Sequence, residues 1–327
     1  MAVEVRQLGD DQLEERVGGA KLQAMDQVYI DDVLAYTERG LDSLPSYMDL
    51  YRRAIKQAWN PDELDFSADK REWESLSPET KQRRVAGLRL FFDGEERVAS
   101  ILAPFVWAAP TKEIEAFAAT QLTDEVRHTV FFERYWRDVI GTSATDLGSL
   151  IHEVRPTEIP AYRQVFYEWL PGVAQRLASD PRDLDSTVEF VTLYHLVVEG
   201  ALFLTGMRYL LEGARRWSRT WAFYKGFTAT TRDESRHVLF GVRFLRDMVA
   251  QDPARFVPIV RGTVDRALPL IEGHIKPAGA PISLYGGKHL EVAWPGYTPE
   301  RMQDEMLEYA RMILTRRLHA AGLAIAA

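Results

Sequence analysis

Cysteine is absent from the 327 residues of this chain. Its absence excludes disulfides, zinc sites with thiolate ligands, iron–sulfur clusters and cysteine nucleophiles. Any metal ion must therefore be held by aspartate, glutamate or histidine. A basic excess is missing too, because the formal net charge is −8. Since nucleic-acid-binding proteins usually carry a positive face, we expect no nucleic-acid partner.

Long apolar runs are also missing. No stretch of about 18 uninterrupted apolar residues occurs, as a membrane-spanning helix would need, and the longest apolar segment, LVVEGALFLTGM, is interrupted by Glu199. The first residues, MAVEVRQLGDDQLEERVGG, are polar and acidic, unlike a secretory signal. We therefore expect no membrane span and a cytoplasmic location.

Helical periodicity dominates the chain, whereas the alternation typical of β-strands is scarce. Apolar residues recur every three or four positions in segments that are separated by turn signals such as Asn60-Pro61 and Asp252-Pro253. We predict one all-α domain over residues 1–327. Its parts are a four-helix core at about 79–250, a helical N-terminal extension at about 1–58, and a C-terminal loop and helix at about 253–327. A turn-rich stretch from Lys276 to Glu300 is expected to form a loop with one short strand or hairpin.

Acidic residues occupy positions where these helices should be apolar. In the helix predicted at about 79–109, Glu95 falls on the apolar stripe between Phe92 and Val98. In the next helix the inward positions that lack an apolar residue are Glu125 and His128. A spacing of three residues places two side chains on one helix face, one turn apart.

The third and fourth helices repeat this arrangement. The third, about Leu184 to Gly213, is apolar almost all round, so Glu199 at its centre should be buried. The fourth, about Ser218 to Ala250, carries Glu234 and His237 on its inward face. Four solvent-exposed glutamates are the alternative interpretation, and Glu199 argues most clearly against it.

Together these helices supply a Glu, a Glu-x-x-His, a Glu and a second Glu-x-x-His, which is the ligand pattern of ferritin-like di-iron and di-manganese carboxylate bundles. One such motif alone is weak evidence, but two on apolar stripes are strong. Four buried carboxylates repel one another unless cations neutralise them, and oxygen with imidazole ligation suits iron or manganese. We predict Asp233 to orient a ligand histidine. The predicted metal ligands are Glu95, Glu125, His128, Glu199, Glu234 and His237.

The other histidines lack this acidic company. His195 lies one turn before Glu199 and is interpreted either as an extra ligand or, in preference, as a hydrogen-bonded core histidine. The remaining ones are expected at the surface or in loops, and they are His152, His274, His289 and His319.

With these residues in view, the sequence resembles the ribonucleotide reductase small-subunit superfamily over roughly Trp59 to Val249. Within that superfamily it is most similar to the ligand-binding oxidases. The segments that carry the resemblance follow in the family's order: AWNPDELDFSADKREWESLSPE, FFDGEERVASILAPF, TDEVRHTVFFERYW, AYRQVFYEWLP, TLYHLVVEGALFLTGMRYL and TRDESRHVLFGVRF.

The resemblance implies a pair of metal ions, manganese with iron or two irons. One would be bound by Glu95, Glu125 and His128, and the other would be surrounded by Glu199, Glu234 and His237, with some carboxylates bridging. It also implies a bound long-chain fatty acid, dioxygen as a co-substrate, and a homodimer.

Four further residues receive roles from the resemblance. Val98 and Tyr194 match the valine and tyrosine that the oxidases join by an ether cross-link. Trp59 and Asp233 match the tryptophan and aspartate that form the superfamily's electron-transfer path with the first metal-bound histidine. We therefore expect an oxidase that activates dioxygen for two-electron oxidation of a C–H bond, of Val98 or of a bound substrate.

Three other functions stay open. A reductase small subunit commonly carries a radical tyrosine where Phe132 stands, although the manganese–iron subclass does without it, and it ends in a docking tail that this sequence is not expected to have. An oxygenase of another small metabolite would use the same site, but arylamine oxygenases carry an added histidine where Thr230 stands. A storage ferritin is disfavoured because its chain is much shorter.

Overall fold

The computed structural model describes residues 8–155, 159–217, 221–277 and 295–324. Within these residues the regular secondary structure is entirely helical. The prediction of an all-α fold is therefore confirmed. The strand or hairpin expected between Lys276 and Glu300 falls mainly on residues 278–294, which lie outside the described residues, as does His289.

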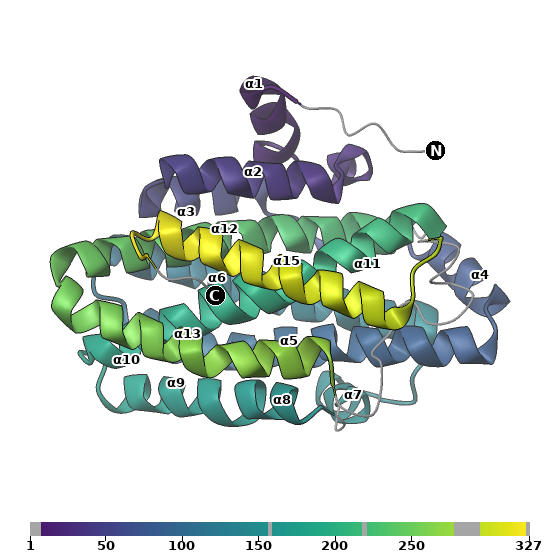
Figure 1. Cartoon of the computed structure of the whole chain (residues 1–327). Helices are drawn as coiled ribbons and strands as arrows, with labels where there is room; N and C mark the ends of the chain where they lie inside the picture. Colours follow the sequence, from purple (N-terminus) through teal and green to yellow (C-terminus); the bar gives the residue numbers. More distant parts are fainter. Residues whose placement is uncertain (1–7, 156–158, 218–220, 278–294, 325–327) are drawn as a thin grey trace.

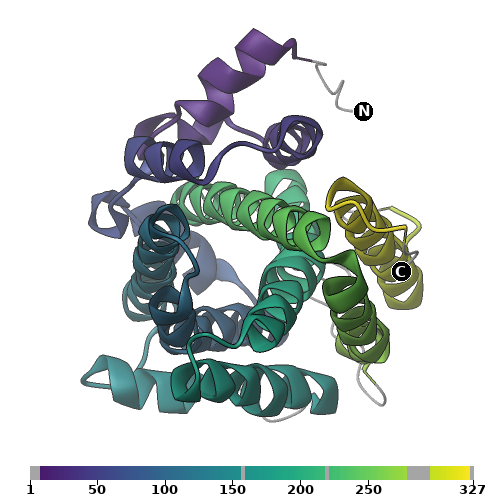
Figure 2. The ribbon, with the colours of Figure 1, turned by 90° about the vertical axis from the view of Figure 1, so that its left-hand side faces the viewer.

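Four long helical rods form the core (Figures 1 and 2). They are α5 (Pro78–Ala108), α6 (Lys112–Tyr135), a rod that runs through α10 (Leu184–Val191), η6 (Thr192–Phe203) and α11 (Leu204–Trp217), and α12 (Trp221–Gln251). α5 packs on α6, and η6 packs on α12. Side-chain caps set two of the starts: Ser77 accepts a hydrogen bond from the Thr80 N–H, and Thr111 from the Ile114 N–H.

The N-terminal part lies over one side of this core (Figure 1). It contains α1 (Asp10–Leu13), η1 (Glu14–Gly18), η2 (Leu22–Gln27), α2 (Ile30–Ser43) and α3 (Tyr47–Gln57). η3 (Pro61–Glu63) follows, and α4 (Ser67–Ser75) lies at one end of the bundle. α2 packs on α12 and α3 packs on α6. Buried arginines of α12 fasten this part to the core, because Arg232 donates hydrogen bonds to the carbonyls of Ala20 and Gln57.

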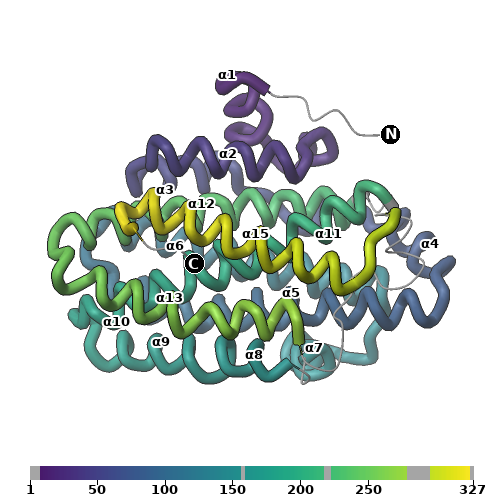
Figure 3. Tube along the Cα trace, viewed as in Figure 1, coloured from purple at the N-terminus to yellow at the C-terminus, as the bar shows by residue number. Residues whose placement is uncertain are grey.

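The remaining helices cover the other sides of the core, as the chain path in Figure 3 shows. η4 (Trp136–Ile140), α7 (Leu147–Val154), α8 (Pro160–Arg163), η5 (Gln164–Trp169) and α9 (Leu170–Ser179) follow α6, and α9 packs on α5. α13 (Pro253–Ile275) and α15 (Pro299–Ala320) both pack on η6 and on each other. The helix α15, which begins after its N-cap residue Thr298, was predicted from the sequence.

Among the described residues, the rod that contains η6 is the helix long and apolar enough to cross a membrane. The stretch Leu184–Arg216 has the length and the mean hydropathy, 1.5 over an 18-residue window, of a helix that could cross a membrane, and 94% of that window is buried inside the protein. It passes this test although Glu199 interrupts its apolar run. A core helix that is apolar all round has the same composition, and the burial fits that explanation.

One histidine lies where the sequence did not place it. His274 was expected at the surface or in a loop, but it lies in the last turn of α13, with its ring 5.8 Å from the Tyr162 ring. Burial lowers the pKa of His274 to about 4. The side chain is half-buried because α13 packs on α8, so His274 is only partly exposed. His152 and His319 are exposed, as expected.

Candidate metal centre

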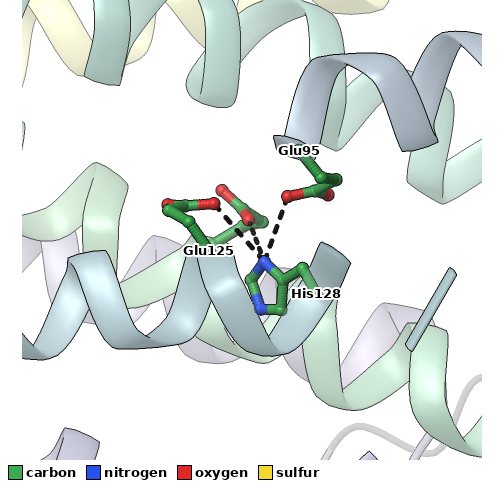
Figure 4. A group of neighbouring side chains, drawn as sticks. Glu95, Glu125 and His128 are labelled. Atoms are coloured by element: carbon green, nitrogen blue, oxygen red, sulfur yellow. Dashed lines mark hydrogen bonds and ion pairs between the residues drawn. The ribbon is translucent and has the colours of Figure 1, made fainter. Parts of the chain in front are cut away.

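The six predicted ligand side chains meet in the interior of the bundle, and each is at most 1% exposed. They form two overlapping groups, in each of which the donor atoms lie within 4.8 Å of one another. One group is Glu95, Glu125, His128 and Glu234, and the other is Glu125, Glu199, Glu234 and His237. Figure 4 shows Glu95 and Glu125 converging on His128 from two helices. Glu125 and Glu234 belong to both groups, so both ions of a bound pair would share these two carboxylates.

The distances between atoms assign one oxygen of each bridging carboxylate to each group. Nδ1 of His128 lies 3.1 Å from Glu95 Oε2, 3.3 Å from Glu234 Oε1 and 3.5 Å from Glu125 Oε2. Nδ1 of His237 lies 3.3 Å from Glu199 Oε1, 3.3 Å from Glu125 Oε1 and 3.5 Å from Glu234 Oε2. Each imidazole therefore points one nitrogen at three carboxylate oxygens, which is a donor set that suits iron or manganese.

Several of these donor atoms have no hydrogen-bond partner. They are Glu95 Oε1, Glu199 Oε2, both carboxylate oxygens of Glu234, and His237 Nδ1. Each buried polar atom that lacks a hydrogen-bond partner lowers the stability of the fold, by on the order of several kcal/mol. Two cations coordinated by these atoms would remove that cost. The residues present therefore fit a pair of metal ions.

The electrostatics of the centre support the same conclusion. Burial and the nearby Glu234 carboxylate raise the pKa of Glu199 well above its ordinary value, and burial raises the pKa of Glu95 to about 8. Although burial alone lowers the pKa of His128, the Glu95 carboxylate and its neighbours raise it well above the ordinary value. Without metal, the centre thus retains protons that metal binding would displace.

Two aspartates orient the two histidines reciprocally. Asp233 Oδ2 lies 3.3 Å from Nε2 of His128 on α6, whereas Asp124 Oδ2 lies 3.3 Å from Nε2 of His237 on α12. Each aspartate directly precedes a glutamate that both groups share, and it hydrogen bonds to the ligand histidine of the other helix. An imidazole whose second nitrogen is bound in this way is fixed in orientation and tautomer.

Two arginines, Arg236, which is buried, and Arg127, which is half-buried, hold these aspartates ionised. Arg236 donates to Asp233 Oδ1 at 2.8 Å and to Asp124 Oδ2 at 2.9 Å, and Arg127 donates to Asp124. Although burial raises the pKa of Asp233, Arg236 and its neighbours hold it well below the ordinary value. The sequence predicted the role of Asp233, whereas those of Asp124 and both arginines were not predicted. The signal was the repeated spacing Asp-Glu-x-Arg-His, which occurs at 124–128 and again at 233–237.

Trp59 extends the network from the metal centre toward the N-terminal part. Its indole Nε1 donates to Asp233 Oδ2 at 2.8 Å, the same oxygen that faces His128. The structure thus brings together the three residues of the expected electron-transfer path, Trp59, Asp233 and His128, in one chain of hydrogen bonds. Their role in electron transfer stays a prediction.

Tyr194 and Val98 also lie in the buried centre. The Tyr194 hydroxyl donates to Glu125 Oε1 at 2.9 Å, so it contacts a bridging carboxylate directly. Val98 is 1% exposed and lies one helical turn after Glu95 on α5. His195, in contrast, belongs to neither ligand group and hydrogen bonds to Gln121, which agrees with the preferred interpretation as a core histidine.

Comparison with known families identifies the fold around this centre. A family model described as the small chain of ribonucleotide reductase matches residues 43–268, a span that contains all six predicted ligands. The chain belongs to this family. The match to the ribonucleotide reductase small-chain family runs from the last residue of α2 into α13, so it includes the four core rods and the tryptophan Trp59.

Solved structures of this family's fold are similar to the chain along most of its length. An R2-like ligand-binding oxidase with an aerobically reconstituted Mn/Fe cofactor is 23% identical with a TM-score of 0.70, and the match covers 83% of this chain and 92% of that one. A variant of such an oxidase, also with an aerobically reconstituted Mn/Fe cofactor, is 25% identical with a TM-score of 0.71, and 84% and 96% are covered. The predicted ferritin-like, small-subunit-like helical fold is confirmed.

Proposed function

We propose that this chain is a dimetal carboxylate oxidase of the ribonucleotide reductase small-chain family. The observation that carries the proposal is the pair of overlapping ligand groups that share Glu125 and Glu234 in a dry interior. Manganese with iron is the proposed pair, with two irons as the alternative, because the similar solved structures hold a Mn/Fe cofactor. When bound, such a pair supplies two-electron oxidation with dioxygen.

The protein's own residues supply charge balance, orientation and exclusion of water. Four glutamates offset the charge of two divalent ions. The reciprocal aspartates Asp124 and Asp233 fix the imidazoles, and the Tyr194 hydroxyl is bound to Glu125. Because none of the six ligands is more than 1% exposed, the reacting atoms would be shielded from solvent.

The proposal is tested by loading metal-free protein with Mn(II) and Fe(II) in air. Elemental analysis should give two metal ions per chain, and dioxygen consumption should accompany the loading. A matched variant, Glu234→Gln, keeps the side-chain volume but removes one bridging charge, and it should lose most of the bound metal. If the wild-type chain retains no tightly bound metal after loading, the proposal is wrong.

A cross-link between Val98 and Tyr194 is the finer part of the proposal. It would join a side-chain carbon of Val98 to the Tyr194 oxygen with loss of two hydrogen atoms, and dioxygen would be the oxidant. The burial of both residues and the contact of Tyr194 with Glu125 support it. After loading in air, intact mass should fall by two hydrogens and peptide mapping should connect the two peptides, whereas Tyr194→Phe should show neither change.

A fatty acid is the proposed ligand, and an apolar cavity supports it. The cavity, of about 60 Å³, lies among α5, η6, α11, α13 and α15, and the rings of Phe91 and Phe203 line it. Phe91 lies one turn before Glu95 and Phe203 one turn after Glu199, and their ring centroids are 5.8 Å apart. This volume accommodates only part of an alkyl chain. A full long-chain fatty acid would therefore require the rings of Phe91 and Phe203 to move.

Met306 and Met312 on α15 provide a matched test of this ligand. Met306 lines the cavity, whereas Met312 is 55% exposed. Met306→Trp should fill the cavity and lower the amount of fatty acid that solvent extraction and mass spectrometry detect per chain. Met312→Trp should leave that amount unchanged. Equal fatty-acid content in both variants would contradict the placement of the alkyl chain.

A second function uses the same site. The hydrogen-bonded chain Trp59–Asp233–His128 matches the electron-transfer path expected across the superfamily, so it also fits a reductase small subunit of the manganese–iron type, which lacks a radical tyrosine. A reductase subunit must act with a large subunit. Nucleotide reduction after addition of a large subunit would favour this function, and its absence would favour the oxidase. The homodimer stays a prediction, which size-exclusion chromatography with light scattering can test.

A further inference from the structure

A buried amide beside the metal centre has no role in the function described so far. Gln121 lies one turn before Glu125 on α6 and is 0% exposed. Its Nε2 donates to Glu199 Oε1 at 2.9 Å, and its Oε1 lies 3.0 Å from Nε2 of His195. The three side chains thus form one line of hydrogen bonds that ends on a predicted metal ligand.

The chemistry of these groups fixes the direction of each hydrogen bond. A glutamine carbonyl oxygen can only accept, so Nε2 of His195 must carry the proton that it donates to Gln121. The amide NH2 must then face Glu199, whose oxygen accepts. A rotated amide would place its carbonyl oxygen against the carboxylate, and two acceptors would face each other. The Glu199 carboxylate thus selects the NH2 end of Gln121, and His195 holds the other end by donating to the carbonyl oxygen.

His195 itself is held in place by apolar packing. Its ring centroid lies 5.2 Å from that of Phe240 and 5.9 Å from that of Phe105. Gly241, one turn after His237 on α12, leaves room for it, since a Cβ at that position would lie 2.3 Å from the Cβ of His195. A histidine enclosed in this way cannot turn away from Gln121 without disturbing the core.

The metal position that contains Glu95 and His128 has no glutamine that corresponds to Gln121. Thr230 stands four residues before Glu234, as Gln121 stands four residues before Glu125, but its buried hydroxyl has no hydrogen-bond partner. Glu95 occupies the place in its group that Glu199 has in the other, but the hydrogen-bond partner of Glu95 among the described residues is the ligand His128 and not an amide. The second coordination sphere therefore differs between two ligand sets that are otherwise alike.

We propose that Gln121, aligned by His195, is a positioning residue that holds Glu199 Oε1 beside Nδ1 of His237 and so sets the affinity of one of the two metal positions. The oxygen that Gln121 binds is the one that lies 3.3 Å from that nitrogen. Loss of the amide frees the Glu199 carboxylate to rotate, which weakens the position formed with Glu125, Glu234 and His237. The position that contains Glu95 keeps its affinity. This inference rests on the proposed metal centre.

Stepwise Mn(II) binding to metal-free protein tests the inference without reference to activity. Gln121→Leu removes both hydrogen bonds at nearly constant volume, and Thr230→Val is the matched control on the other motif. Calorimetric titration, with electron paramagnetic resonance to distinguish coupled from isolated Mn(II), gives the two affinities. For Gln121→Leu we expect the Mn(II) affinity of the position that contains Glu199 to fall about 10–100-fold, as is usual when a group that orients a ligand is removed. The affinity of the position that contains Glu95 should stay within about threefold of the wild-type value, roughly the scatter of such measurements.

His195→Phe provides a second variant that keeps the ring packing. It removes the donor that orients Gln121, so it should weaken the same metal position, though less than Gln121→Leu does. Thermal unfolding of the metal-free variants shows whether each is folded. If the wild type binds two Mn(II) ions and Gln121→Leu binds both as tightly, or loses both affinities equally, the inference is wrong and the proposed centre stands. A wild type that binds neither Mn(II) nor Fe(II) overturns the centre itself.

Discussion

Asp124, which precedes Glu125 on α6, lies 3.3 Å from Nε2 of His237 on α12. The converse contact joins Asp233 on α12 to His128 on α6 at the same distance. Each helix thus brings its own ligands and also the aspartate that orients the ligand histidine of the other. The two Asp-Glu-x-Arg-His motifs act as one interlocked unit.

This reciprocity predicts the effect of removing either aspartate charge. Asp124→Asn and Asp233→Asn should each lower the affinity for the metal pair about 10–100-fold, because the amide cannot hold the imidazole as firmly as a carboxylate does. Competition with a chelator measures the affinity. Asp247→Asn is the matched control, since Asp247 pairs with Arg243 at the half-buried edge of α12. Wild-type affinity in both aspartate variants would contradict the orienting role.

Trp59 should matter for electron transfer and not for metal binding. Trp59→Phe keeps an aromatic ring but loses the hydrogen bond to Asp233 Oδ2. Two metal ions should still bind, whereas reduction of the oxidised centre by an external donor should be slower in stopped-flow absorbance. Trp136→Phe is the control, because Trp136 is buried against Phe92, with ring centroids 5.4 Å apart. Equal reduction rates in both variants would remove Trp59 from the path.

The stability of the metal-free protein should decrease as pH rises. Burial raises the pKa of Glu95 from 4.5 to about 8, so between these values the folded chain keeps a proton that the unfolded chain has released. The stabilisation is complete below about pH 4.5 and is lost as pH rises toward 8. Urea unfolding at several pH values measures this slope.

A variant and the metal-loaded protein isolate this effect. Glu95→Gln cannot titrate, so the free energy of unfolding of this variant should depend less on pH than that of the wild type over the same range. Metal-loaded protein should show the opposite trend, since metal binding displaces protons and strengthens as pH rises. A steeper pH dependence in Glu95→Gln would show that the proton resides elsewhere.

Gly241 should tolerate no side chain. A Cβ there would lie 2.3 Å from the Cβ of His195, which is the rigid base of that side chain, so Gly241→Ala should destabilise the protein by about 1–3 kcal/mol. Gly262 is the control. It lies exposed within α13 with no atom within 4 Å of an added Cβ, so Gly262→Ala should stabilise by about 0.5–1 kcal/mol. Denaturant unfolding compares the two.

The long core helices could be predicted from the sequence because their apolar stripes are regular. The first was expected at about 79–109 and is Pro78–Ala108, and the fourth was expected at about Ser218 to Ala250 and is Trp221–Gln251. The third was expected as one helix, but its middle, Thr192–Phe203, is π-helical. Periodicity cannot reveal that change, since an apolar rod shows no polar face from which to count turns.

The metal ligands could also be predicted from the regular apolar stripes, because a glutamate at a stripe position stands where an apolar residue is expected. The groups that support them were harder to find. Gln121 and Asp124 were missed, because a polar residue that hydrogen bonds across helices leaves no trace in the pattern of its own helix. His274 was misplaced since its burial depends on the packing of α13 on α8.

The interlocked motifs also bear on when the protein can acquire its metals. The first motif is synthesised more than a hundred residues before the second, yet Nε2 of His128 is bound by Asp233 of the second motif, and Glu234 completes both groups. A growing chain that ends before α12 already carries Glu95, Glu125, His128 and Glu199, but it lacks His237 and Glu234, the carboxylate that both groups share. We therefore expect tight loading to wait until α12 has emerged and docked, so that an unfinished chain holds a single ion only weakly.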